Sequence, residues 1–111
     1  MNSWQNSCVV KSKMDKIYSL LGLCQKAGKM ISGEVGCEAA IKNKTAKLLV
    51  LAEDASENTK KKFQNSATYY HIPILILGSK ERIGMALGKE SRAILAIIEE
   101  GFAKSILKKI K

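Results

Sequence analysis

The chain has 111 residues, of which 46% are hydrophobic, and it carries 19 Lys and Arg against 10 Asp and Glu, for a net charge of +9. This length suits one domain with one core, and so high an apolar fraction excludes an intrinsically disordered chain. The positive charge favours a polyanionic partner. A basic protein that is merely soluble is the alternative, because net charge bears on association and not on fold.

The cysteines and the hydropathy point to the compartment. Cys8, Cys24 and Cys37 include no C-x-x-C pair, so neither a disulfide framework nor a zinc knuckle is expected. A reducing, cytoplasmic setting is the simplest expectation. No apolar run approaches the roughly 18–20 residues that cross a bilayer, and the N-terminus lacks the long apolar core of a secretory signal. We therefore expect no membrane partner.

The beginning of the chain has no clear hydrophobic periodicity. Val9 and Val10 are too few to nucleate a helix or strand. We expect a flexible N-terminal extension over residues 1–13, followed by a single domain over residues 14–111.

The first two helices of the domain are predicted from apolar stripes and caps. Asp15 is placed to cap the first helix, and Gly28 is placed to end it. Met30 and Ile31 form a short strand at best, and Ser32 is expected to cap the second helix. The inward residues recur every three or four positions: Ile17, Leu20, Leu21 and Cys24 in the first helix, and Cys37, Ala40 and Ile41 in the second.

Two glycines, Gly33 and Gly36, fall in the first turn of that second helix. Glycine costs about 1 kcal/mol per residue in helix propensity. One interpretation is simple tolerance near a frayed end. The other is close approach of a phosphate backbone to exposed N–H groups at a helix N-terminus.

The central stretch, residues 46–56, contains a continuous apolar run that fits a strand buried on both faces. Glu53 and Asp54 follow the strand, and Ser56 is placed to cap a helix over residues 57–70. This order delivers polar groups to a sheet edge, where α/β proteins usually bind ligands. The two acids are adjacent, so their side chains diverge and do not form a paired-carboxylate site.

The helix over residues 57–70 ends beside His71, the one histidine of the chain. A single histidine cannot form a multi-histidine metal site, and no nucleophile stands at a recognisable spacing from it. We therefore expect no catalytic residue, no metal and no cofactor. The Lys60, Lys61 and Lys62 triplet is interpreted as a solvated helix face.

The last third of the chain repeats the alternation of strand and helix. Pro73 opens a second buried strand, and Ser79 caps a short helix that Gly88 ends. A last buried strand follows over residues 93–98, and then a final helix. The segment from Gly84 to Lys89 superficially resembles a phosphate-binding loop, but its glycine spacing is one residue short and no Ser or Thr follows the lysine.

Buried strands with helices between them predict an α/β fold. The expected architecture is a three-layer α/β/α sandwich with a small mixed sheet of about four strands.

Several segments together resemble a known family. They are SGE at 32–34, AKLLVLAEDAS at 46–56, YY at 69–70 before IP at 72–73, GSK at 78–80 and EGFA at 100–103. This set resembles the YlxQ type of bacterial ribosomal-protein-like RNA-binding protein, within the kink-turn-binding ribosomal proteins called the L-seven-Ae family. The resemblance covers roughly residues 14–111.

The resemblance implies a non-enzymatic, monomeric protein that binds structured RNA, either rRNA or a kink-turn-like RNA, in association with the ribosome or translation. In the family, a helix N-terminus, the end of the central strand and the following loop grip a sharply bent duplex with tandem sheared G·A pairs. The implied RNA-binding residues are Gly33, Glu34, Val35, Gly36, Ala39, Lys42, Glu53, Asp54, Leu77, Gly78, Ser79, Lys80 and Arg82.

The sequence departs from the family pattern in the second helix. Kink-turn binders typically carry Asn and Glu two and three positions after the helix-opening glycine, and Lys three positions further on. Here those positions are Val35, Gly36 and Ala39. Each lost base contact costs about 1–3 kcal/mol of discrimination. We therefore expect fold and general RNA affinity to persist better than kink-turn selectivity. A protein-interaction adaptor on the same scaffold is the alternative.

Overall fold

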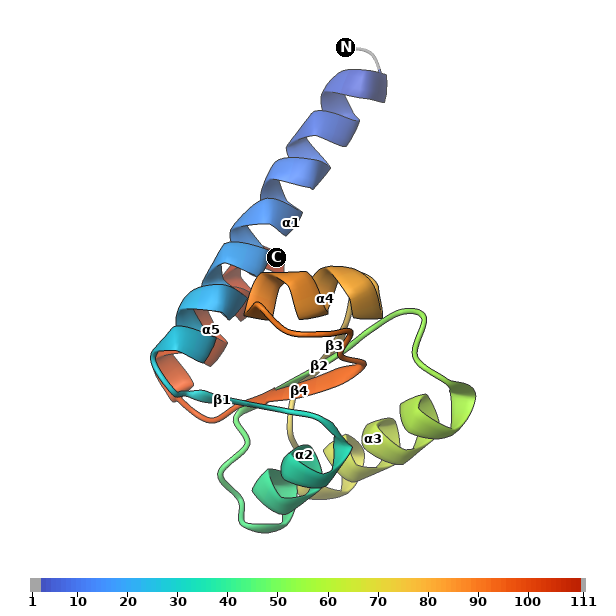
Figure 1. The fold of residues 1–111 in the computed structure, drawn as a ribbon, viewed down its shortest axis with the longest axis vertical. Coiled ribbons are helices and arrows are strands. Elements are labelled where there is room, and N and C mark those ends of the chain that lie inside the picture. The colour runs from blue at the N-terminus through green and yellow to red at the C-terminus, as the bar shows by residue number, and fades with distance from the viewer. Residues whose placement is uncertain (1–2, 111) are drawn as a thin grey trace.

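The computed structural model describes the backbone of residues 3–110 and the side chains of residues 15–109. Within that range five helices alternate with four strands along the chain (Figure 1). The elements are α1 (Ser3–Lys26), β1 (Met30–Ser32), α2 (Glu34–Lys42), β2 (Leu48–Leu51), α3 (Glu57–Tyr70), β3 (Ile74–Ile76), α4 (Lys80–Leu87), β4 (Ile94–Ile97) and α5 (Glu100–Ile110).

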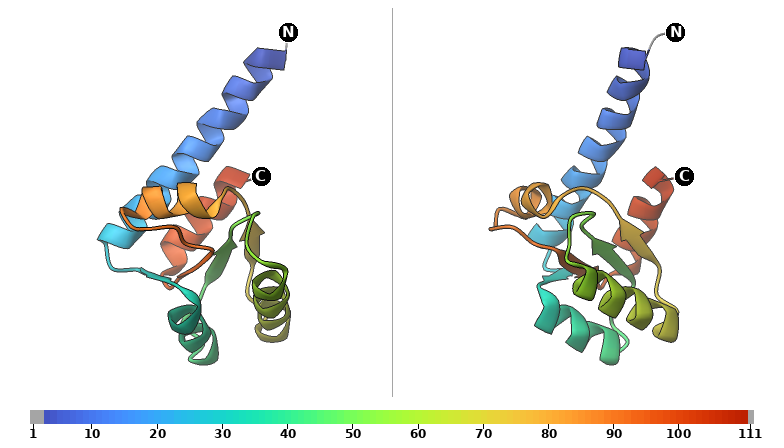
Figure 2. Two further views of the ribbon diagram at one scale, coloured as in Figure 1. Left: turned by 45° about the vertical axis from the view of Figure 1, so that its right-hand side comes forward. Right: turned by 90° about the vertical axis from the view of Figure 1, so that its right-hand side faces the viewer.

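The strands form one mixed sheet in the order β1-β4-β2-β3. β2 and β3 are parallel, whereas β4 runs antiparallel to both β1 and β2. Figures 1 and 2 show α1, α4 and α5 on one face of this sheet and α2 and α3 on the other. The three-layer α/β/α sandwich predicted from the sequence is therefore confirmed.

The two central strands form the middle of the core. Every residue of β2 and β4 is buried, as the continuous apolar runs predicted. The strand that Pro73 opens was also predicted to be buried, but it differs. This strand, β3, lies at the sheet edge and pairs with β2 alone. Ile74 and Leu75 are half-buried there, and Ile76 is 43% exposed. The prediction that β3 is buried like β2 was wrong.

The N-terminal part of the chain is helical from Ser3, so the prediction of no regular element over residues 1–13 was wrong for residues 3–13. No Gly or Pro interrupts this segment, and helix propensity alone allows a helix to extend through residues that lack an apolar stripe. Figures 1 and 2 show α1 projecting away from the sheet. Because the helix runs through Asp15, that residue does not cap it. The flexibility of the extension stays a prediction, and residues 1–2 lie outside the described range.

The helix caps follow the sequence except at Asp15 and Ser32. The Ser56 hydroxyl accepts the Thr59 N–H at 3.2 Å, and glycines with positive φ follow the ends of α1 and α4. Ser32 was expected to cap α2 but belongs to β1, where it pairs with Leu95. The N-cap is instead Gly33, which has φ 93° and supplies no side-chain acceptor. The prediction for Ser32 was therefore wrong.

Candidate nucleic-acid interface

The three predicted pieces of the interface meet at one end of the sheet, through backbone hydrogen bonds. The Gly33 N–H, at the start of α2, donates to the Ile94 carbonyl at 3.1 Å. Ile94 is paired with Leu51, the last residue of β2. The Glu53 N–H then donates to the Gly78 carbonyl at 2.9 Å, in the loop after β3. The start of α2, the end of β2 and this loop therefore form one continuous backbone edge, which we call the ladder edge.

Asp54 holds the loop of the ladder edge. Its carboxylate accepts the Lys80 N–H at 2.8 Å, at the first turn of α4, where the helix dipole favours an acid. The Ser79 hydroxyl caps the same helix by accepting the Arg82 N–H at 3.1 Å. The Arg92 N–H donates to the Lys80 carbonyl at 3.0 Å, which ties in the loop before β4. Asp54 therefore positions the backbone that carries Ser79 and Lys80.

The loop rests on α1, a support that sequence reasoning missed. Gly78 has φ 64°, and a Cβ atom built on it would overlap the Tyr18 hydroxyl. The Arg82 guanidinium lies 4.8 Å from the centre of the Tyr18 ring and 3.8 Å from the Asp15 carboxylate. Leu77 is buried and fixes the start of the loop. In the sequence, the one feature that distinguishes Tyr18 is its position next to Ile17, in the apolar stripe of α1.

The start of α2 is more open than the loop. Val35 is 82% exposed, and Ala39 is also exposed. Gly36 is different, because a Cβ atom there would lie 2.6 Å from Ile31 Cγ2. Close packing of α2 on β1 therefore accounts for glycine at this departure from the family pattern. Val35 and Ala39 have no comparable packing reason.

The acids beside the start of α2 are paired across the layer by Lys62 of α3. Lys62 Nζ forms an ion pair with Glu38 and lies 3.7 Å from Glu34 Oε1. The hydrogen bond to the Glu38 carboxylate raises the pKa of Lys62 above its usual value. Lys62 is exposed, as the solvated-face interpretation of the triplet expected, but the pairing with these acids was not predicted. Its actual position reduces the negative charge next to the ladder edge.

One predicted RNA-binding residue lies apart from the others. Lys42 is in the last turn of α2, at the far end of the helix from Gly33. It borders a small hollow with Glu38, Ser66 and Tyr70. The structure therefore brings Gly33–Gly36, Glu53, Asp54 and residues 77–80 to the ladder edge, with Arg82 beside the loop on α4. Ala39 lies in the second turn of α2, and Lys42 lies farthest away.

The two cysteines with described side chains belong to the core. Burial raises the pKa of the Cys24 thiol to about 11 and that of the Cys37 thiol to about 12, with smaller contributions from nearby glutamates. Both thiols are thus protonated at neutral pH, which is unfavourable for a nucleophile. The described side chains, those of residues 15–109, form no cluster of His, Cys, Asp and Glu suited to a metal ion. No helix within residues 3–110 combines the length and apolar character that crossing a bilayer requires.

The chain is thus a small α/β protein with a mixed four-stranded sheet. Backbone hydrogen bonds form a surface at one end of this sheet. The chain belongs to the ribosomal protein L7Ae/L30e/S12e/Gadd45 family, whose model matches residues 15–107. This confirms the family that the sequence motifs indicated.

Named relatives cover most of the chain. "RNA-binding protein YlxQ" of Bacillus subtilis (strain 168) is 40% identical over 90 residues, which are 81% of this chain and 90% of that protein. "RNA-binding protein YlxQ" of Enterococcus faecium is 44% identical over 89 residues, 80% of this chain and 85% of that one. A solved protein with unknown function from Bacillus halodurans C matches with a TM-score of 0.83 and 33% identity, covering 86% of this chain and 96% of that chain.

Proposed function

We propose that this chain is a non-enzymatic binder of structured RNA and that the ladder edge is its RNA-binding surface. The observation that carries the proposal is the backbone hydrogen bonding that brings Gly33, Glu53 and Gly78 to one end of the sheet. The net charge of +9 and the printed names of the YlxQ relatives support a nucleic-acid partner.

The ladder edge offers backbone donors to a phosphate. Gly33 provides no side-chain cap, so the first-turn N–H groups of α2 can donate to an anion at the positive end of the helix dipole. Exposed Lys80 adds a positive charge on the loop side. A sharply bent RNA, whose phosphates come close together, matches donors and charge held in fixed positions.

The finer part of the proposal concerns selectivity. Val35 presents an apolar side chain where the family pattern has a reader of base edges, and Gly36 cannot carry a side chain without moving Ile31. We therefore expect this protein to bind bent RNA with weak discrimination for tandem G·A pairs. The proposed setting is a ribosomal or translation-associated RNA in the cytoplasm, bound by a monomer.

The test is a titration of the full chain with a kink-turn RNA and with the same RNA lacking its G·A pairs, at two salt concentrations. Submicromolar binding at low salt, weakened at high salt, is expected for both RNAs, with less than about a tenfold difference between them. Lys80→Ala should weaken binding to both, whereas Lys108→Ala on α5 should not. Absence of binding to either RNA at low salt would refute the proposal.

One observation favours a second candidate, a protein-interaction adaptor on the same scaffold. Val35 is an 82% exposed apolar residue on the α2 side of the proposed surface. An adaptor would retain a stoichiometric protein partner in a pull-down from RNase-treated lysate, and Val35→Asp would release that partner. Loss of all partners on RNase treatment would exclude this candidate.

A further inference from the structure

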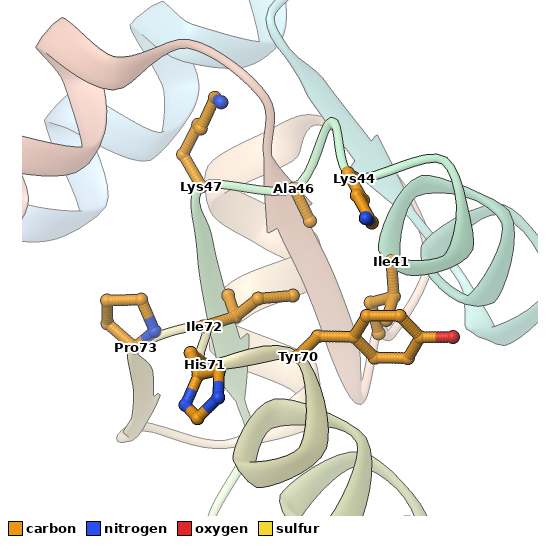
Figure 3. A pocket seen from close by; sticks show the side chains of 8 residues that line it. All are labelled: Ile41, Lys44, Ala46, Lys47, Tyr70, His71, Ile72 and Pro73. Carbon is orange, nitrogen blue, oxygen red and sulfur yellow. The ribbon is translucent and has the colours of Figure 1, made fainter.

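A separate hollow of about 400 Å³ lies at the opposite end of the sheet from the ladder edge (Figure 3). It is bounded by the residues that enter β2 and β3 and by the ends of α2 and α3. The Leu49 N–H donates to the Pro73 carbonyl at 2.9 Å, and the Lys47 N–H donates to the Ile97 carbonyl at 2.7 Å. Hydrogen bonds of the sheet therefore hold the backbone at this end of the hollow.

The hollow has an apolar floor and a basic rim. Ile41 and Ala46 are buried and Ile72 is partly buried, whereas Lys44 and Lys47 are exposed. None of the described residues that border the hollow is an acid. The acid of the neighbouring depression, Glu38, is paired with Lys62. The rim therefore presents uncompensated positive charge above an apolar surface.

Two ring side chains complete the lower side of the hollow. Figure 3 shows the Tyr70 ring below Ile41 with its hydroxyl directed outward, and the His71 imidazole at the lower rim. Ile72 extends between them and the entry to β2. An apolar pocket of this size with a few polar groups at its rim is typical of small-ligand sites.

The backbone at the rim adds an independent observation. Within the described residues, the non-glycine residues with positive φ are Lys44, at 62°, and His71, at 58°. Each follows the end of a helix, where glycine is the usual residue because a side chain is disfavoured in this conformation. Such strained residues concentrate at functional sites. Here both carry side chains that border the same hollow.

We propose that this hollow binds an unpaired nucleotide. Its phosphate lies against Lys44 and Lys47, and its base lies on the apolar floor beside Tyr70 and His71. Lysine holds a phosphate as a point charge, and any base has a flat face that can lie on an aromatic or apolar surface. The site goes beyond the proposed function, because it lies away from the ladder edge and would hold either a free nucleotide or a single-stranded part of a bound RNA.

The direct test is an amide chemical-shift titration of the full ¹⁵N-labelled chain with three probes: inorganic phosphate, adenosine 5′-monophosphate and a single-stranded hexamer of riboadenosine. We expect saturable shifts over residues 41–47 and 70–72 with the two nucleotide probes, and weaker binding of phosphate. Tighter binding of the hexamer identifies an RNA strand as the source, and equal binding identifies a free nucleotide. Shifts confined to residues 33–36 and 77–80, or no saturable shift, would overturn the proposal.

The strained positions give variants that separate binding from folding. Lys44→Gly and His71→Gly should each weaken nucleotide binding at least fivefold, while the melting temperature is unchanged or raised because glycine removes the backbone strain. Lys108→Ala removes one exposed positive charge from another layer and should leave binding unchanged. Wild-type binding by both glycine variants, or equal weakening by Lys108→Ala, would contradict the site.

The test of nucleotide binding in the hollow does not depend on RNA binding at the ladder edge. Lys80→Ala should leave the nucleotide-induced shifts of the hollow intact, and Lys44→Gly should retain kink-turn RNA binding at the ladder edge. If the kink-turn RNA fails to bind while adenosine 5′-monophosphate shifts the hollow, only the proposed function fails. If the reverse holds, only the second site fails.

Discussion

The two sides of the ladder edge are built differently. On the loop side, Asp54 after β2 and Tyr18 of α1 hold the backbone of residues 77–80, and Ser79 within that segment caps α4. On the α2 side, the N-terminus has no side-chain cap and Val35 is almost fully exposed. Substitutions on the loop side should therefore cost stability, whereas exposed positions of α2 should alter recognition alone.

Gly84→Ala should have the largest effect on stability. A Cβ atom at this position would overlap the Glu90 carbonyl and lie 2.9 Å from Ser91 Cα, and backbone atoms cannot move aside cheaply. We expect a loss of about 2–3 kcal/mol in the free energy of unfolding, measured by urea denaturation. This contact also explains the glycine of the apparent phosphate-binding loop. Gly88→Ala is the matched control, with no crowding but φ 69°, and should cost about 1 kcal/mol.

Gly78→Ala should destabilise the protein by about 1–3 kcal/mol, because it combines a positive φ with overlap of the Tyr18 hydroxyl. Tyr18→Phe removes the overlapping oxygen and should recover part of the loss in the double variant. A double-mutant cycle of unfolding free energies measures this coupling. Additive effects would show that Tyr18 does not support the loop.

Asp54→Asn should reduce stability by about 0.5–1 kcal/mol and weaken RNA binding, because an amide oxygen is a poorer acceptor for the Lys80 N–H at the positive end of α4. The carboxylate of the adjacent Glu53 accepts no hydrogen bond within the described residues. Glu53→Gln should therefore change stability much less. Thermal melts of the two variants compare them directly. Equal losses of stability in the two variants would show that Asp54 does not position the loop.

Val35→Asn should leave stability within about 0.5 kcal/mol of wild type, since the side chain is exposed. It should nevertheless raise the preference for kink-turn RNA over the RNA lacking G·A pairs about fivefold or more, by supplying a donor and acceptor for base edges. Parallel RNA titrations measure this ratio. Val35→Ala is the control and should not change it.

Gly36→Glu is a poorer test of whether a polar side chain at the start of α2 restores kink-turn selectivity. Its Cβ atom would displace Ile31, so lost binding could reflect a shift of α2. The double change Gly36→Glu with Ile31→Ala removes the obstacle. Gly36→Glu should therefore lower the melting temperature less in the Ile31→Ala background than in the wild-type background, as measured by thermal melts.

Local patterns in the sequence were sufficient for the layers of the fold and for its elements after residue 14, but not for the helix over residues 3–13. The apolar runs of β2 and β4 and the serine before α3 each act within a few residues, so hydropathy and capping rules apply directly. The exposed edge position of β3 was not predictable in this way. It depends on strand order, which is set by the packing of the whole sheet.

The candidate interface was predictable as a set of segments but not as a set of contacts. The family motifs indicated the ladder edge, yet the contacts of Gly36 with Ile31 and of Gly78 with Tyr18 join residues on different elements. The pairing of Lys62 with Glu38 likewise crosses from α3 to α2. No pattern of spacing within one element reveals such neighbours.

The position of β4 has a consequence for synthesis. This strand comes late in the chain but lies between β1 and β2, so the sheet cannot close until residues 94–97 are available. Until then β1 has no partner, and Gly33 lacks the Ile94 carbonyl that fixes the start of α2. A growing chain would therefore complete its ladder edge only after residues 94–97 have been synthesised. Pulse-labelling hydrogen exchange during refolding should show the Gly33 amide becoming protected together with those of β4, and earlier protection of Gly33 would contradict this order.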